Sequence, residues 1–306
     1  MKIATLYPGQ GAQAVGMGKE LVESSAACRA LFDRASEVLG FDLAKLCAEG
    51  PIEELTRSCN TQPAIFAVSA AARTALREAG APEPALSAGL SSGEWAALWD
   101  AGVVSFEDAL RILRARGTYM QEACEATPGG MVTVIGLPPA KVEEIAASVG
   151  LEVANYNSPL QTVMSGRADR LADGEAAAKA AGAKRALRLT VAGAFHTSLM
   201  APAAEKLGEF LKGVELKAPR IPVWSNVTGK PHGGPEEIRA SMVAQVSHSV
   251  RWAECFADMA ASGMERAFEC GPGSVLAGLA KRMAPTAPVA SVGDPASAAA
   301  ALAEIG

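Results

Sequence analysis

Short apolar runs alternate with longer amphipathic stretches in the first part of the chain. The run Ile3 to Tyr7 predicts a strand, and a second predicted strand ends at Leu90. Between them, periodic apolar positions predict helices near Lys19 to Val38 and Gln62 to Glu78, and a long amphipathic helix follows from about Phe106 to Ala126. This alternation of strands and helices is typical of an α/β fold with a parallel sheet.

The segment Thr127-Pro128-Gly129-Gly130 interrupts this rhythm and predicts a boundary. Six elements are expected after it, at Met131 to Ile135, Ala140 to Val149, Glu152 to Tyr156, Gln161 to Ser165, Asp169 to Ala181 and Arg185 to Val191. Their order is strand, helix, strand, strand, helix, strand, which is ferredoxin-like. Beyond residue 198, strands near Pro222 to Ser225 and Arg266 to Glu269 and a terminal helix, Pro295 to Ala303, are expected. We therefore predict a large domain, residues 1–127 and 198–306, with an inserted small subdomain, residues 128–197.

Composition narrows the classes of function. A chain of 306 residues with 49% apolar content can bury a substantial core. A net charge of −5 without a Lys/Arg-rich run argues against a nucleic-acid partner, although a small basic docking patch remains compatible. The longest apolar run, near Ala64 to Ala72, is too short to span a membrane, and the first residues form no signal-peptide hydrophobic region, so a cytoplasmic protein is expected. Six scattered cysteines without CxxC pairs predict neither a metal site nor a disulfide framework.

A candidate nucleophile lies at Ser91. The sequence Gly89-Leu90-Ser91-Ser92-Gly93 fits the G-x-S-x-G pattern, in which a strand turns sharply into a helix and exposes the serine hydroxyl. The apolar residues before it predict the strand, and Glu94 to Asp100 predicts the helix. The alternative is an ordinary Gly-Ser turn.

A serine hydroxyl needs a base, and the chain has three histidines. His232 lies among glycines in a stretch expected to be an exposed loop, and His248 lies in a polar stretch. His196 follows Gly193-Ala194-Phe195, where small residues allow close approach of backbone or substrate. We predict His196 as the base, with a structural histidine as the alternative.

Arg116 shares an apolar helix stripe with Leu113 and Met120. A guanidinium on such a stripe requires an anionic partner, either an internal Asp or Glu or the carboxylate of a ligand. The planar guanidinium matches a carboxylate with two hydrogen bonds, so the second alternative predicts a dicarboxylic acyl group.

Several motifs together resemble one family nearly from end to end. They are Pro8-Gly9-Gln10-Gly11, Thr61-Gln62-Pro63-Ala64, Gly89 to Glu94, Arg116-Gly117, Asn155-Tyr156-Asn157-Ser158-Pro159, Gly193-Ala194-Phe195-His196, Ser225-Asn226-Val227 and Gly271 to Leu276. In this order they resemble the malonyl-CoA:acyl carrier protein transacylases. The resemblance implies an α/β-hydrolase-like large domain with a ferredoxin-like insertion. It also implies malonyl-CoA and acyl carrier protein as partners, and no cofactor.

The resemblance assigns roles to individual residues. Ser91 would attack the thioester and carry the acyl group, and His196 would take the serine proton, in a two-step ping-pong reaction. The Arg251 main-chain carbonyl would orient His196, and the backbone N–H groups of Gln10 and Ser92 would hold the oxyanion.

Three further site residues contact the substrate in this scheme. Arg116 would bind the malonyl carboxylate, Gln10 would line the substrate site, and Phe195 would crowd an α-methyl group, which favours malonyl over methylmalonyl units. Leu90, Ser92 and Trp95 depart from the residues that are commoner in the family, so they leave acyl selectivity open.

Three alternatives remain open at this point. A stand-alone acyltransferase that serves a polyketide synthase in trans would use the same chemistry with another carrier. A thioester hydrolase would use Ser91 and His196 with water as the acceptor, and a silent binding module would never acylate Ser91. The absence of a heptad run or an obvious dimer helix favours a monomer.

Overall fold

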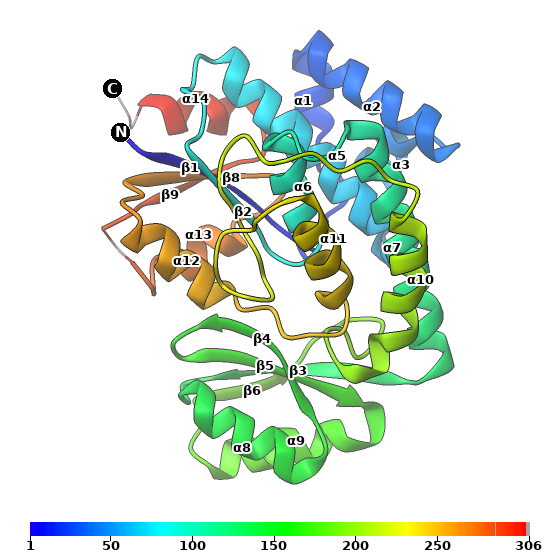
Figure 1. Ribbon diagram of the computed structural model, residues 1–306, viewed down its shortest axis with the longest axis vertical. Helices are drawn as coiled ribbons and strands as arrows, with labels where there is room; N and C mark the ends of the chain where they lie inside the picture. The colour runs from blue at the N-terminus through cyan, green and yellow to red at the C-terminus, as the bar shows by residue number, and fades with distance from the viewer. Residues whose placement is uncertain (285, 304–306) are drawn as a thin grey trace.

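The computed structural model describes residues 1–284 and 286–303, and its strands form two separate sheets (Figure 1). The strands are β1 (Ile3–Tyr7), β2 (Leu86–Gly89), β3 (Gly129–Ile135), β4 (Glu152–Ser158), β5 (Gln161–Arg167), β6 (Arg185–Arg188), β7 (Val223–Trp224), β8 (Arg266–Cys270) and β9 (Val289–Val292).

The helices surround both sheets. The α-helices are α1 (Lys19–Ser24), α2 (Ala26–Leu39), α3 (Leu43–Glu49), α4 (Ile52–Thr56), α5 (Ser58–Glu78), α6 (Gly93–Asp100), α7 (Phe106–Ala126), α8 (Pro139–Val149), α9 (Leu171–Ala180), α10 (Ala201–Leu211), α11 (Pro235–Ala244), α12 (Trp252–Ala261), α13 (Val275–Ala280) and α14 (Pro295–Ala303). Two short 3-10 turns are η1 (Ala168–Arg170) and η2 (Ser198–Met200).

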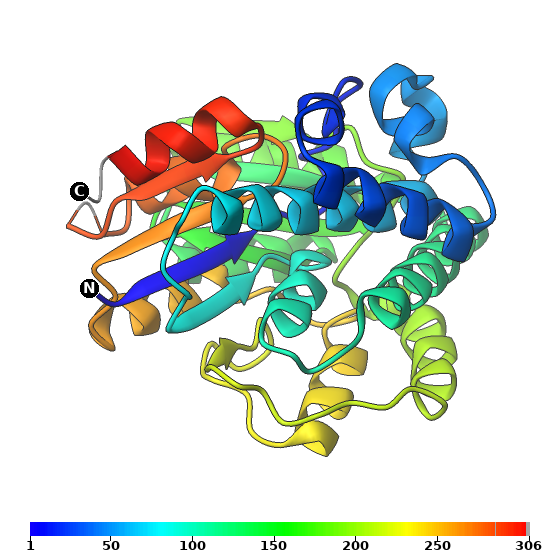
Figure 2. The ribbon, with the colours of Figure 1, turned by 90° about the horizontal axis from the view of Figure 1, so that it is seen from above.

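The first sheet is parallel, with the strand order β7-β2-β1-β8-β9. Every residue of β1 is buried, because helices cover both faces of the sheet. Ile3 and Tyr7 pack into the cluster that α2, α5 and α7 share, whereas Ala4 and Leu6 pack with residues of α12 and α13 (Figure 2). The sheet therefore lies between two helical layers, as the predicted α/β class requires.

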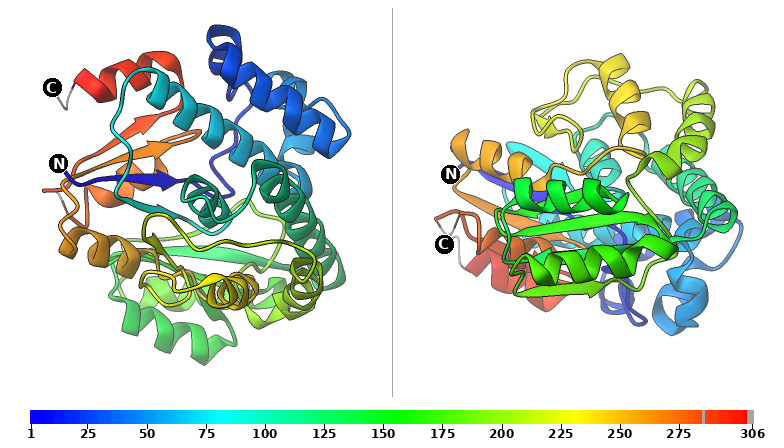
Figure 3. Two further views of the ribbon diagram at one scale, coloured as in Figure 1. Left: turned by 45° about the horizontal axis from the view of Figure 1, so that its top comes forward. Right: turned by 90° about the horizontal axis from the view of Figure 1, so that it is seen from below.

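The second sheet is antiparallel and is formed by residues 129–188, with the strand order β4-β5-β3-β6. Helices α8 and α9 cover its outer face (Figure 3), where Val132, Val142 and Met164 belong to a separate apolar core. The elements follow the chain as strand, helix, strand, strand, helix, strand, so the order predicted from the sequence is confirmed.

Backbone hydrogen bonds join the antiparallel sheet to the segment before α12. Tyr156 N–H of β4 donates to the Val250 carbonyl at 2.9 Å, and Val250 N–H donates to the Ala154 carbonyl at 2.8 Å. The antiparallel sheet is thereby fixed against the segment between α11 and α12, and the inner face of that sheet turns towards the parallel sheet (Figure 1).

Several predicted boundaries were wrong. The helix expected from Lys19 to Val38 is two helices, because the Ser25 side chain accepts a hydrogen bond from Cys28 N–H and caps α2. The strand expected to reach Val191 ends at Arg188, and β9 was missed altogether. The β9 sequence, Val-Ala-Ser-Val, is too short to give a clear periodic signal. Within the described residues, no helix is both long and apolar enough to cross a membrane.

Candidate active site

Ser91 lies in a sharp turn between β2 and α6, which is the setting that the G-x-S-x-G pattern predicts. Its φ is +54°, a left-handed conformation that is uncommon for a serine. Both flanking glycines are required, because backbone atoms of neighbouring segments lie where a side chain would begin. A Cβ at Gly89 would lie 2.0 Å from the Gly93 carbonyl carbon, and a Cβ at Gly93 would lie 2.3 Å from the Tyr7 carbonyl oxygen. The turn is therefore built to expose one side chain.

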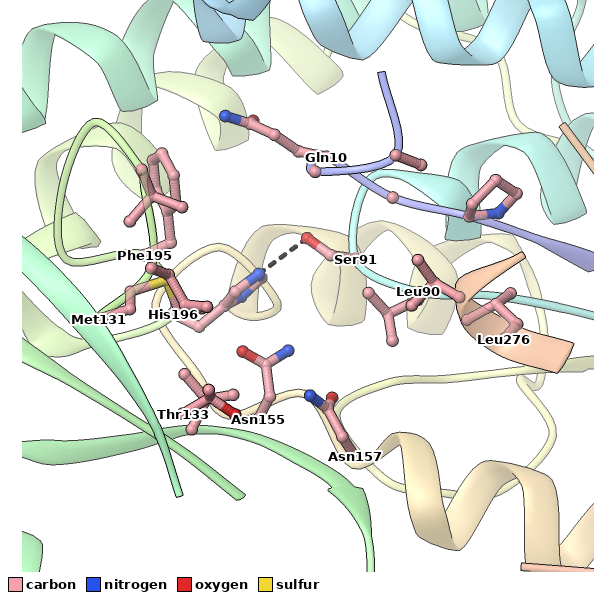
Figure 4. Close-up of a pocket in the computed structure, with 18 of the residues that line it drawn as sticks. Gln10, Leu90, Ser91, Met131, Thr133, Asn155, Asn157, Phe195, His196 and Leu276 are labelled. Carbon is pink, nitrogen blue, oxygen red and sulfur yellow. Dashed lines mark hydrogen bonds between the residues drawn. The ribbon is translucent and has the colours of Figure 1, made fainter. Parts of the chain in front are cut away.

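The structure brings His196 to this hydroxyl. His196 Nε2 lies 2.7 Å from Ser91 Oγ (Figure 4), and Nδ1 lies 2.8 Å from the main-chain oxygen of Gln245. A carbonyl only accepts, so Nδ1 carries the proton and Nε2 keeps its lone pair for the serine hydroxyl. Burial, and then the charge of Arg116, lowers the pKa of His196 to about 4. The imidazole is thus neutral at physiological pH and able to act as a base.

The prediction that the Arg251 carbonyl orients His196 was wrong. Arg251 precedes α12, and its carbonyl accepts the Cys255 N–H of the first helical turn at 3.0 Å. The Gln245 carbonyl comes directly after α11, where carbonyl groups lack a partner within the helix. That helix end lies beside the imidazole, and only the tertiary structure reveals it.

Arg116 points from α7 to the same hydroxyl. Its Nη2 lies 3.2 Å from Ser91 Oγ and 2.9 Å from Gln245 Oε1, and its Nη1 lies 2.8 Å from Gln62 Oε1. The residue is 1% exposed, and within the described part of the chain no carboxylate forms an ion pair with it and its Nε has no partner. Burial lowers its pKa to about 10, while Glu94 raises it. A buried cation held by two amide oxygens and a hydroxyl, all of them uncharged, fits an incoming anion.

A cavity of about 300 Å³ opens in front of these groups. The loop after β1, with Gln10, and Leu90 line one side, and the antiparallel sheet lines the other with Met131, Thr133, Asn155 and Asn157 (Figure 4). Phe195 and Met120 also line it. The site thus lies between the two sheets.

Gln10 is held by a relay of polar side chains. Its Nε2 donates to Ser58 Oγ at 3.1 Å, and its Oε1 accepts from Gln62 Nε2 at 3.3 Å. Gln62 also accepts from Arg116, so it links the loop after β1 to the guanidinium. Sequence reasoning noticed the Thr61-Gln62-Pro63 motif but gave Gln62 no role. The signal available was a polar residue directly before the apolar run Pro63 to Val68.

Asn226 and Gln245 were also missed, and they hold the serine backbone. Asn226 Oδ1 accepts the Ser91 N–H at 2.6 Å, and Asn226 Nδ2 donates to the Gly89 carbonyl at 2.8 Å. Gln245 Nε2 donates to the Ser91 carbonyl at 3.0 Å. Ser92 is 3% exposed, and among the described residues its hydroxyl has no hydrogen-bond partner.

The other two histidines lie outside the cavity. His248 is exposed, and its side chain does not line the cavity. His232 was expected in an exposed loop, and this was wrong. Its side chain is fully buried, and Nε2 lies 2.6 Å from Glu94 Oε1. The carboxylate offers this imidazole a partner in the interior, which the local sequence does not indicate. Nowhere in the described ranges do three or more His, Cys, Asp or Glu side chains gather to hold a metal ion.

The Ser91 hydroxyl, the neutral imidazole of His196 and the guanidinium of Arg116, which forms no ion pair among the described residues, face one cavity, and this arrangement suits the chemistry of acyl transfer. The chain belongs to the acyl transferase domain family, which matches residues 5–295. It is 41% identical over 305 residues to the malonyl CoA-acyl carrier protein transacylase of Escherichia coli (strain K12), covering 98% of this chain and 99% of that protein. The malonyl CoA-acyl carrier protein transacylase of Bacillus subtilis (strain 168) is 40% identical over 299 residues, which cover 96% of this chain and 94% of that protein.

Among solved structures, the fold is similar to a malonyl-transacylase in complex with its type II polyketide synthase acyl-carrier protein. The TM-score is 0.95 and the identity 40%, with 99% of this chain and 100% of that chain covered.

Proposed function

We propose that this protein transfers a malonyl group from malonyl-CoA to the phosphopantetheine thiol of an acyl carrier protein, through a malonyl ester on Ser91. The observation that carries the proposal is the buried guanidinium of Arg116, which lies 3.2 Å from Ser91 Oγ without an acidic partner in the described chain. A cation in this place favours an acyl group that ends in a carboxylate.

In the first half-reaction, Ser91 Oγ attacks the thioester carbonyl while its proton moves to His196 Nε2. The tetrahedral intermediate carries a negative oxygen, which the backbone N–H groups of Gln10 and Ser92 stabilise. The carbon–sulfur bond then breaks, and His196 returns its proton to the coenzyme A sulfur. The products are free coenzyme A and the Ser91 ester.

In the second half-reaction, the carrier's phosphopantetheine thiol gives its proton to His196 and attacks the ester. The ester bond breaks, the proton returns to Ser91 Oγ, and the malonyl group leaves as a thioester of the carrier. Both half-reactions use one base and one oxyanion site, so no cofactor is required beyond the two substrates.

The lining of the cavity supports selectivity within this scheme. Arg116 binds the malonyl carboxylate, and Phe195, which is 6% exposed, limits the room for an α-methyl branch. On the opposite wall, Thr133 Oγ1 and Asn157 Oδ1 are buried without partners in the described residues. They suit the amide groups of a pantetheine arm, which both substrates carry.

Intact-mass analysis after brief incubation with malonyl-CoA tests the proposal. Wild type should gain one malonyl group, Ser91→Ala should gain none, and Arg116→Ala should lose malonylation while its reaction with acetyl-CoA, which has no carboxylate, changes little. A folded wild-type protein that forms no adduct with any short acyl-CoA would rule out the transferase. Steady release of malonate without a carrier would identify a hydrolase instead.

The same chemistry serves a stand-alone acyltransferase of a polyketide synthase. The structural neighbour bound to a type II polyketide synthase carrier favours keeping this second candidate. Transfer rates from the malonylated protein to carriers of fatty acid and polyketide synthesis, compared side by side, distinguish the two.

We also propose the finer assignments that the sequence and the family resemblance indicated. They are an α/β-hydrolase-like large domain, residues 1–127 and 198–306, with a ferredoxin-like insertion, residues 128–197. They also include a monomeric state and a cytoplasmic location. The sheet order β4-β5-β3-β6 supports the ferredoxin-like assignment.

A further inference from the structure

A buried, hydrogen-bonded pair of side chains lies directly behind the nucleophile, outside the cavity. Glu94, on the first turn of α6, has a side chain that is 1% exposed, and His232 has a side chain that is 0% exposed. Their Oε1 and Nε2 atoms are 2.6 Å apart. Main-chain bonding fixes His232 in turn, because its N–H donates to the Val223 carbonyl of β7 at 2.8 Å. The mechanism above uses neither side chain.

The second oxygen of Glu94 reaches both residues that hold the serine backbone. Oε2 accepts from Gln245 Nε2 at 2.6 Å and from Asn226 N–H at 3.1 Å. Through these two residues the carboxylate supports the Ser91 N–H and carbonyl in a left-handed turn. Such a conformation is strained and persists only when its surroundings hold it in place.

Gln245 stands between a group that only accepts and a group that only donates. Its Nε2 donates to Glu94 Oε2 and to the Ser91 carbonyl, and its Oε1 accepts from Arg116 Nη2 at 2.9 Å. A carboxylate cannot donate and a guanidinium cannot accept, so the amide fits in one orientation. If it were flipped, an NH₂ group would face Arg116 and an oxygen would face Glu94.

We propose that Glu94, held by His232, is a positioning residue that sets the preference for a carboxylated acyl group by locking Gln245 in the orientation that aims Arg116. This inference rests on the proposed function. The carboxylate acts through Gln245 and does not touch the substrate, so its loss should weaken malonyl selectivity and not only stability. The charge of Glu94 also keeps the buried guanidinium cationic, since it raises the pKa that burial lowers.

Single-turnover acylation of Ser91 by malonyl-CoA and by acetyl-CoA measures this role. Glu94→Gln replaces the acceptor-only carboxylate with an amide that can turn its NH₂ group towards Gln245, so that the Ser91 carbonyl is left as the acceptor that holds Gln245 Nε2. We expect the malonyl-to-acetyl rate ratio to fall by roughly tenfold, the size of one hydrogen bond to a charged group. His232→Leu removes the donor to Glu94 and should lower the ratio in the same direction. His232→Gln keeps a nitrogen donor at that end and should restore most of the ratio.

Asp100→Asn is the matched control. Asp100 is a buried carboxylate at the opposite end of α6, where Tyr7, Thr5 and Arg73 bond to it. Its loss should lower the melting temperature and leave the ratio unchanged.

The inference is overturned if His232→Leu and His232→Gln give the wild-type ratio, or if Glu94→Gln slows both acyl groups by the same factor. Should Glu94→Gln fail to fold, the His232 pair decides alone. A wild-type protein that accepts no malonyl group contradicts the proposed function, which is a separate outcome.

Discussion

At the scale of residues, the site joins a neutral base and a cation around one hydroxyl. His196 Nε2 and Arg116 Nη2 lie 2.7 Å and 3.2 Å from Ser91 Oγ. The guanidinium helps to keep the imidazole in its base form, because its positive charge disfavours protonation of His196. The base is therefore ready before substrate binds, and the cation remains available for the substrate.

This arrangement predicts unusual tolerance of acid in the first half-reaction. The pKa of His196 is lowered to about 4, so its base form is present above that pH and is lost only below it. A histidine with the ordinary pKa near 6.5 would be about 3% neutral at pH 5, and the rate would drop about 30-fold from pH 8. We expect the Ser91 malonylation rate to fall less than about twofold between pH 8 and pH 5.

Quenched-flow mass spectrometry at the two pH values measures that rate. Circular dichroism at pH 5 serves as the control for folding. A drop near 30-fold in folded protein would show that the imidazole keeps its ordinary pKa.

At the scale of elements, two long helices meet at a contact that leaves no room for a side chain. A Cβ at Gly117 of α7 would lie 2.2 Å from the Ser58 carbonyl oxygen of α5. The neighbouring Arg116 donates a hydrogen bond to the Gln62 side-chain oxygen across the same pair of helices. The close approach of α5 and α7 therefore sets where the guanidinium points.

Gly117→Ala should consequently damage both stability and the site. The clash is with backbone, which cannot move aside as a flexible side chain can, so we expect a loss of about 1–3 kcal/mol in the free energy of unfolding and slower malonylation. Gly208→Ala, in α10, is the matched control, because its new methyl group would meet Val243 at an ordinary 3.6 Å. That change should raise stability by about 0.5–1 kcal/mol through helix propensity.

Urea unfolding and the acylation assay measure the two effects together. Equal stability of the two alanine variants would contradict the close contact between α5 and α7.

At the scale of the whole molecule, the cavity belongs to neither sheet alone. One wall of the cavity contains Gln10 and Ser91, in the loops that follow β1 and β2 of the parallel sheet. The opposite wall is the inner face of the antiparallel sheet (Figure 4). The backbone bonds between β4 and Val250 hold the two walls together. A ligand that contacts both walls should therefore stabilise the molecule as one unit.

Thermal unfolding of Ser91→Ala with added malonyl-CoA tests this expectation without acyl transfer. A ligand that binds only the folded state, present at a concentration 100 times its dissociation constant, adds about 2.7 kcal/mol to the free energy of unfolding. With malonyl-CoA, we expect the melting temperature of Ser91→Ala to rise by several degrees in one shared unfolding transition. Acetyl-CoA should raise it less. In the double variant Ser91→Ala/Arg116→Ala, malonyl-CoA should change the melting temperature little. Two separate transitions, of which only one responds, would contradict the joint site.

The sequence by itself determined the features that depend on neighbouring residues. The strand, sharp turn and helix around Ser91 follow from two glycines and the apolar run before them, and α7 matches its predicted range from Phe106 to Ala126. Local packing and backbone preferences specify such elements within a few residues. Local sequence had singled out His196 and Arg116, the family resemblance assigned their roles, and the structure places both at the serine hydroxyl.

Only the tertiary structure decided which groups hold these residues. The Gln245 carbonyl, six positions before the predicted Arg251, faces the imidazole, and His232 pairs with Glu94 across 138 positions of sequence. A main-chain carbonyl has no signature in the residue type, and a histidine among loop glycines gives no sign of the carboxylate it will meet. Contacts between distant segments arise from how helices and strands pack, and a reading along the chain cannot recover that information.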